Sequence, residues 1–186
     1  CYIVDTVQIV YPGLLEIDST HFTNVSCNGA NDAEILAIDV SGGTAPFAYS
    51  VNGSTHYSNM SYFNGYAPGT YTVEVYDVNN CVAADYIIIT EPDELIVDIT
   101  TSGWVFNNNS GLYSYQIKCN GDNSGFANLS ISGGTAPYTE TLLDAIGTVI
   151  SATSFNSFTG LSAGQYDFEV VDANGCAYLE TIVFSQ

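Results

Sequence analysis

The sequence predicts an all-β protein built of tandem immunoglobulin-like β-sandwich repeats. The first observation is an internal repeat: Cys27-Asn28-Gly29 recurs as Cys119-Asn120-Gly121, and the hexapeptide 41–46 recurs unchanged at 132–137. The second is the alternation of apolar and polar residues, which is typical of strands with one buried face. The third is a Gly-Gly, Asn-Gly, Pro-Gly or Asn-Asn turn signal between successive strands. Short strands punctuated in this way favour a sandwich of two antiparallel sheets.

The repeat continues to the end of each copy. Residues 68–75 correspond to 163–170, and the closing motif 77–81 corresponds to 172–176. We therefore expect one repeat over residues 14–92 and a second over residues 93–186. Residues 1–13 run from a cysteine to a proline with the spacing found after Cys81 (12 − 1 = 11 and 92 − 81 = 11), so we expect them to be the last strand of a preceding repeat.

Each element follows from a local pattern. Alternation is strict over residues 127–131 and 166–170, fairly clean over 71–76 and partial over 34–40, and it predicts a strand at each of these places. The Gly42-Gly43 and Gly133-Gly134 pairs predict turns in which at least one glycine of each pair has positive φ. An apolar strand at 86–89 runs almost directly into another at 95–99, so we expect a stiff joint near Glu91-Pro92-Asp93 and a semi-rigid rod.

The second copy carries an insert between Ile99 and Cys119 that contains the only tryptophan, Trp104. An exposed tryptophan beside other aromatic residues could stack on a sugar or a partner protein. The alternative is a structural role, in which Trp104 caps the joint between the copies or closes one end of the sandwich.

The charge excludes several partners. Twenty acidic residues face one basic residue, Lys118, for a formal net charge of −19. Because nucleic acids and anionic membranes are bound by clustered Lys and Arg, we expect no nucleic acid partner and no direct membrane insertion. A hydrophobic content of 46% argues against disorder.

Five cysteines suggest two pairs and one left over. Each copy has two cysteines at matching places, which predicts disulfides Cys27–Cys81 and Cys119–Cys176, with the partner of Cys1 lying upstream. Zinc is the rival interpretation, but it needs close ligand pairs that the sequence lacks. Disulfides imply an oxidising compartment.

The ordered set of motifs resembles the SprB-type repeat of giant cell-surface adhesins of gliding Bacteroidetes. The resemblance implies an extracellular immunoglobulin-like module in a filament that is exported by type IX secretion and moved along the cell surface. It also implies O-glycosylation at Thr6 and Ser19, within Asp5-Thr6-Val7 and Asp18-Ser19-Thr20. Asn80 departs from the usual glycine before the second cysteine, and the insert in copy two lies outside the common pattern.

Calcium is the most credible ligand, since the closing turns carry hard oxygen ligands. If the cysteines of each copy pair, the turn after the first cysteine approaches the closing turn. Asx-turns, in which Asp and Asn bind their own backbone, are the alternative. The weak calcium candidates are Asp32, Asp77, Asn79, Asp122, Asp172 and Asn174.

The sequence does not favour an enzyme, because His21 and His56 are isolated and copy two contains no histidine. The expected function is structural and adhesive: modules of a long extracellular filament that contact neighbouring repeats and an external surface or polysaccharide. The alternative is a carbohydrate-binding accessory module of a secreted protein. The copies share a framework but differ in their loops, so binding would be carried by the loops and strengthened by repetition.

Overall fold

The computed structural model describes residues 11–54, 57–58, 62–102, 104–107, 112–116, 121–153 and 156–185. All elements in these ranges are β-strands, so the all-β prediction is confirmed. The contacts divide the chain into two compact units. One holds the described residues up to Val25 with Gly29–Glu91, and the other holds Ser26–Asn28 with the chain from Pro92 onward. The described residues contain no helix long and apolar enough to cross a membrane.

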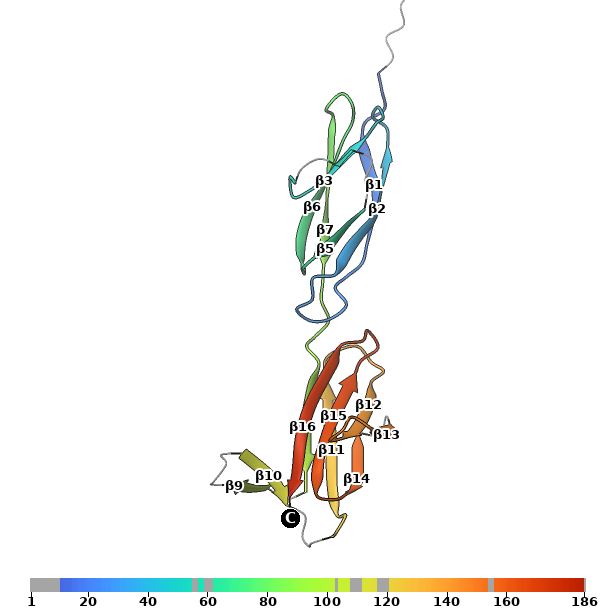
Figure 1. The fold of residues 1–186 in the computed structure, drawn as a ribbon. Coiled ribbons are helices and arrows are strands. Elements are labelled where there is room, and N and C mark those ends of the chain that lie inside the picture. The colour runs from blue at the N-terminus through green and yellow to red at the C-terminus, as the bar shows by residue number, and fades with distance from the viewer. Residues whose placement is uncertain are drawn as a thin grey trace, which may run out of the picture. The chain divides into compact units, whose positions relative to one another are not determined.

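The first unit is a sandwich of two antiparallel sheets (Figure 1). One sheet has the order β1-β2-β5 and the other the order β4-β3-β6-β7, so the chain crosses repeatedly between the layers, as in immunoglobulin-like folds. The strands are β1 (Glu16–Phe22), β2 (Ala33–Ser41), β3 (Ala48–Val51), β4 (Tyr57–Ser58), β5 (Phe63–Tyr66), β6 (Gly69–Tyr76) and β7 (Val82–Ile89).

Alternation along the strands builds the core of this unit. Ile35 on β2, Val73 and Val75 on β6 and Ile89 on β7 are almost completely buried in one cluster. They come from both sheets, so the cluster fills the space between the two layers. Burial of one such side chain stabilises the fold by roughly 1.5–3 kcal/mol.

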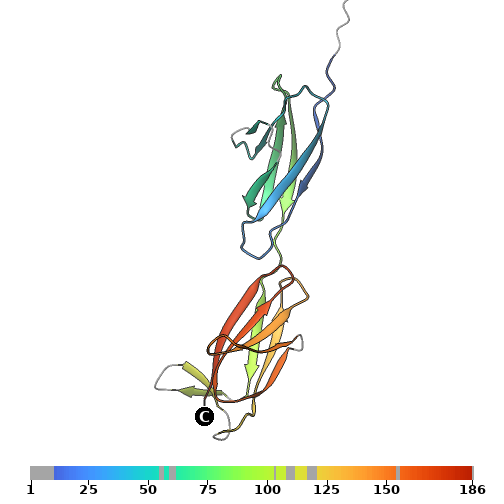
Figure 2. The same cartoon turned by 45° about the vertical axis from the view of Figure 1, so that its right-hand side comes forward.

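The second unit repeats this plan. Its sheets have the orders β14-β11-β8 and β13-β12-β15-β16-β10-β9 (Figure 2). Phe168, Phe184 and Leu142 dominate its core. The strands are β8 (Ile96–Thr101), β11 (Gly125–Ser132), β12 (Thr139–Asp144), β13 (Val149–Thr153), β14 (Ser157–Leu161), β15 (Gly164–Val171) and β16 (Ala177–Ser185).

The insert of copy two forms an additional hairpin of β9 (Trp104–Asn107) and β10 (Leu112–Gln116). β10 pairs in parallel with the end of β16, where Tyr115 lies opposite Phe184. The hairpin therefore extends one sheet at its edge, and in both views it projects beside the end of β16 (Figures 1 and 2). The Trp104 side chain lies outside the described residues, so both roles considered for it stay predictions.

Both copies contain the tyrosine corner found in immunoglobulin-like folds. Tyr71, near the start of β6, donates its hydroxyl to the Ala67 carbonyl at 2.9 Å. Tyr166, at the matching place in β15, donates to the Ser162 carbonyl at 3.2 Å. Each bond ties the start of a central strand to the connection that precedes it.

The paired glycines behave as the sequence predicts. Gly42 and Gly43 have φ of 67° and 60°, and Gly133 and Gly134 have 67° and 58°. A Cβ added at Gly42 would overlap the Leu14 carbonyl oxygen, so the turn is closed to larger residues for a steric reason as well.

Candidate functional site

The closing turn of each copy is organised around a buried aspartate. In copy one, Asp77 Oδ1 accepts the N–H groups of Asn79 and Cys81, each at 2.8 Å. Its other oxygen accepts the Thr44 N–H at 3.0 Å. Asp77 thereby connects the β6–β7 turn to the Gly-Gly-Thr segment, which explains why the two motifs recur together.

Copy two builds the same turn around Asp172. Its Oδ1 accepts the N–H groups of Asn174 and Cys176, each at 2.9 Å, and its Oδ2 accepts the Thr135 N–H at 2.8 Å. Burial raises the pKa of Asp172, but these backbone donors outweigh it and hold the pKa below its usual value. The same balance lowers the pKa of Asp77.

Both oxygens of each carboxylate accept backbone N–H groups, which is the Asx-turn arrangement. Calcium binding at Asp77 or Asp172 stays a prediction. No group of three or more His, Cys, Asp or Glu side chains in the described residues could hold a metal ion.

The structure contains a disulfide between Cys27 and Cys176, with their Cα atoms 5.7 Å apart. The predicted pairs Cys27–Cys81 and Cys119–Cys176 are both wrong, since each would use a cysteine that is bonded elsewhere. Cys81 is a free, exposed cysteine. Cys1 and Cys119 lie outside the described residues.

Strand direction explains why Cys27 cannot reach Cys81. The loop of Cys27 contacts the end of β7, because the Val25 N–H donates to the Thr90 carbonyl at 3.1 Å. Cys81 precedes the first residue of β7, a strand of eight residues. Eight residues of extended strand span about 26 Å, whereas a disulfide allows about 7 Å between Cα atoms. The two cysteines of copy one therefore lie at opposite ends of their sandwich.

The same geometry separates two of the calcium candidates. Asp32 lies in the loop between β1 and β2, on the Cys27 side, and Asp77 lies at the other end of β7. The predicted approach of these two turns depended on the wrong disulfide. Of the other calcium candidates, Asp122 lies just before β11, and Asn79 lies exposed in the turn between β6 and β7.

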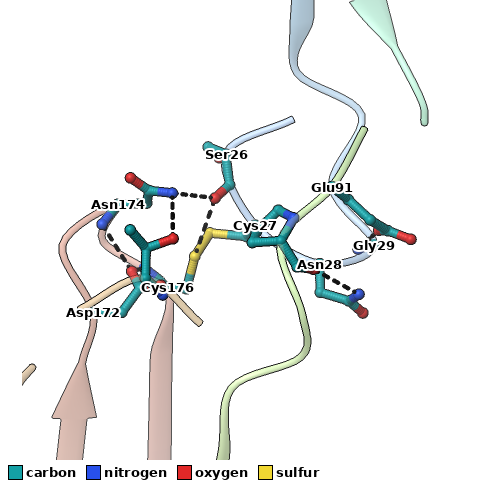
Figure 3. The surroundings of a disulfide bond; sticks show 10 residues. Ser26, Cys27, Asn28, Gly29, Glu91, Asp172, Asn174 and Cys176 are labelled. Atoms are coloured by element: carbon teal, nitrogen blue, oxygen red, sulfur yellow. Dashed lines mark hydrogen bonds between the residues drawn. A yellow bond between two sulfur atoms is a disulfide. The ribbon is translucent and has the colours of Figure 1, made fainter. Parts of the chain in front are cut away.

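Hydrogen bonds surround the disulfide (Figure 3). Asn174 donates from Nδ2 to the Ser26 carbonyl at 3.0 Å and lies 3.1 Å from Thr135 Oγ1. On the other side, Asn28 Nδ2 donates to the Pro92 carbonyl at 3.1 Å. The Ser26–Asn28 segment is held by polar contacts on both sides of its cysteine, which is why it belongs to the second unit although it precedes β2 in the chain.

A second polar cluster was not predicted from the sequence. Ser19 donates its hydroxyl to Asp39 Oδ2 at 2.6 Å, and His21 Nε2 lies 3.0 Å from the same oxygen and 3.2 Å from the Ser19 hydroxyl. A catalytic triad needs one ring nitrogen facing the serine and the other facing the carboxylate, whereas here one nitrogen faces both. Hydrogen bonds from Ser19 and His21 lower the pKa of Asp39, and all three residues lie on paired strands of an exposed sheet face.

The remaining predictions concern the O-glycosylation candidates Thr6 and Ser19 and the second histidine, His56. Thr6 and His56 lie outside the described residues. Ser19, the second O-glycosylation candidate, is half-buried and its hydroxyl is engaged with Asp39. O-glycosylation of either residue stays a prediction.

Two solved structures show some similarity to this chain. Three N-terminal domains of the outer capsid protein Hoc of bacteriophage RB49 align at 13% identity and a TM-score of 0.49, over 91% of this chain and 58% of that one. The C-terminal fragment of intimin, in complex with the intimin-binding domain of its translocated receptor, aligns at 16% identity and a TM-score of 0.46. The alignment covers 94% of this chain and 64% of that one. This chain therefore spans about three fifths of the length of either structure.

No curated protein sequence matches the chain. The family model of the SprB repeat matches two separate stretches, residues 19–56 and 114–145. One stretch lies in each copy, and SprB repeats occur in cell-surface proteins. The resemblance to the SprB repeat is thereby confirmed in both copies of the module.

Proposed function

We propose that this chain is a pair of structural and adhesive modules from a long extracellular filament, of the kind that type IX secretion exports and gliding cells move along their surface. The observation that carries the proposal is the match of both copies to the SprB repeat. The sandwich framework is common to the copies, while their loops and the β9–β10 hairpin differ. Such modules act as spacers with variable contact surfaces.

The disulfide agrees with this location, because such bonds persist in oxidising compartments outside the cytosol. The net charge of −19 favours a soluble surface that avoids self-association. In this proposal the partners are neighbouring repeats and an external surface or polysaccharide.

Location is tested by treating intact cells that produce the protein with a protease and detecting the repeat with an antibody. We expect loss of the signal from intact cells, with a periplasmic protein as the protected control. A signal lost only after permeabilisation would contradict an extracellular filament.

Adhesion is tested with beads that carry either the 186-residue chain or several copies joined in tandem, at equal numbers of repeats per bead. Weak sites gain avidity through effective concentration, so the tandem beads should be retained better on glass and on polysaccharide films. Equal retention per repeat would contradict action by number.

The carbohydrate-binding alternative is separated by a glycan array. A single strong glycan signal that disappears when the insert between Ile99 and Cys119 is shortened would favour that alternative. If the glycan-array profile is unchanged by the same shortening, the insert is not the glycan-binding site.

A further inference from the structure

Cys81 lies in a turn that has the same hydrogen bonds as the turn of Cys176. In both turns the aspartate N–H donates to the cysteine carbonyl at 3.0 Å, and the aspartate side chain accepts the cysteine N–H. In both, the residue before the cysteine has positive φ, 62° for Asn80 and 86° for Gly175. The backbone therefore places the Cβ atoms of the two cysteines in the same way.

The Cys176 turn shows what this geometry binds. It holds the Cys-Asn-Gly loop in two ways: Cys176 bonds to Cys27, and Asn174 Nδ2 donates to the Ser26 carbonyl beside Thr135 Oγ1. The three residues of the turn and its neighbouring segment, Cys176, Asn174 and Thr135, have counterparts in copy one. These are Cys81, Asn79 and Thr44. Cys81 and Asn79 are exposed and Thr44 is half-buried, so the equivalent surface is accessible.

We propose that the Cys81 turn binds the Cys-Asn-Gly loop of a preceding repeat and forms a disulfide with its cysteine. The linkage between Cys27 and Cys176 then becomes the general rule of the array: the first cysteine of one repeat bonds to the second cysteine of the next. This proposal goes beyond the proposed function and requires neither adhesion nor gliding.

Other occupants fit less well. Cys27 is bonded to Cys176 and lies at the opposite end of the first sandwich. A small thiol such as glutathione would leave the Asn79 side chain without the loop carbonyl that its counterpart Asn174 holds. The loop of a Cys-Asn-Gly motif supplies the thiol and, from the residue before the cysteine, that carbonyl.

The bond forms by thiol–disulfide exchange. The two cysteine thiols lose two protons and two electrons and form one S–S bond, while a disulfide oxidant, such as oxidised glutathione or an oxidoreductase disulfide, is reduced to two thiols. The aspartate-centred turn holds the Cys81 backbone before the partner arrives, and contacts between the turn and the loop raise the effective concentration of the reacting groups.

The test extends the full 186-residue chain at its amino end with a second copy of residues 14–80. This places a Cys-Asn-Gly loop one repeat upstream of Cys81. With Cys1 and Cys119 replaced by serine, four cysteines remain: the added loop cysteine, Cys27, Cys81 and Cys176. After equilibration in a glutathione buffer, non-reducing peptide mapping identifies the pairs. We expect the added loop cysteine joined to Cys81, and Cys27 joined to Cys176.

A second measurement asks whether the turn recognises the loop. Asn79→Ala should lower the equilibrium constant of the Cys81 disulfide against glutathione by about two- to tenfold, the value of one hydrogen bond. Asn174→Ala should do the same to the Cys27–Cys176 bond and is the matched control. Cys81 left open to alkylation, Cys81 carrying only glutathione, or the added cysteine joined to Cys27 would each overturn the proposal.

Discussion

Replacing Cys27 or Cys176 with serine should destabilise the second sandwich, whereas replacing Cys81 should not. The two bonded cysteines are 149 residues apart. A closed loop of that length restricts the unfolded chain by about 17 cal/mol/K, which is about 5 kcal/mol at 25 °C. If the first sandwich stays folded while the second unfolds, the flexible part shrinks to roughly residues 92–176, and the same relation gives about 4.5 kcal/mol.

Most measured disulfides contribute less than this relation gives, so we expect a loss of about 3 to 4.5 kcal/mol. For a unit of this size the loss corresponds to a drop in Tm of more than about 10 °C. Urea unfolding followed by circular dichroism measures the free energy, and hydrogen exchange in peptides from β15 and β16 assigns the loss to the second unit.

Cys81→Ser is the control, because this cysteine is exposed and unbonded. Combining Cys27→Ser with Cys176→Ser should cost no more than either change alone, since both remove one bond. The reasoning is refuted if Cys81→Ser and Cys27→Ser are equally destabilising while Cys176→Ser is neutral, because that pattern belongs to a bond within copy one.

Three further predictions concern the framework. Gly42→Ala should destabilise the fold by more than about 1 kcal/mol in thermal melts, because an added Cβ meets the Leu14 carbonyl. Gly53 has a similar φ but open space around it, so Gly53→Ala should destabilise less, and equal losses for the two variants would contradict the steric explanation. The lowered pKa of Asp172 contributes stability that is present above the ordinary carboxyl pKa and is lost as pH falls through the pKa of the folded state. The Tm values of the wild type and of Asp172→Asn should therefore converge between pH 7 and pH 3, and a constant difference between them would refute this. Small-angle scattering should show a narrow distribution of sizes for the chain, because the joint near Glu91-Pro92-Asp93 is short and contains proline, and a broad distribution would refute a stiff joint.

The sequence was sufficient for the fold because the relevant signals are local. Alternation along residues 166–170 marks β15, and paired glycines mark the turn that precedes β12. The insert between Ile99 and Cys119 was recognised from the sequence as lying outside the common pattern, but its β9–β10 hairpin was not predicted.

The disulfide could not be predicted in the same way, because its partners depend on which end of a sandwich each loop occupies. Successive connections alternate between the two ends, so placing Cys27 and Cys81 requires the number of strands between them. β4, which contains only Tyr57 and Ser58, is too short to show alternation, so that number was not available from the sequence. The contact between Asn174 and the Ser26 carbonyl depends on the same placement.

The Cys27–Cys176 bond also determines how the chain can respond to tension. A pulling force that enters before Cys27 and leaves after Cys176 passes through the sulfur atoms, and the 148 residues between them (149 − 1) carry no extension. At about 3.4 Å per residue, the bond withholds about 500 Å of contour length, even if every strand inside the loop unfolds. With the bond proposed for Cys81, the chain segments closed by successive disulfides would overlap along the sequence. A module of the array could then unfold without lengthening the array. Reduction would make the same chain extensible, so the length under load of a filament of the proposed kind would depend on the redox state of its surroundings.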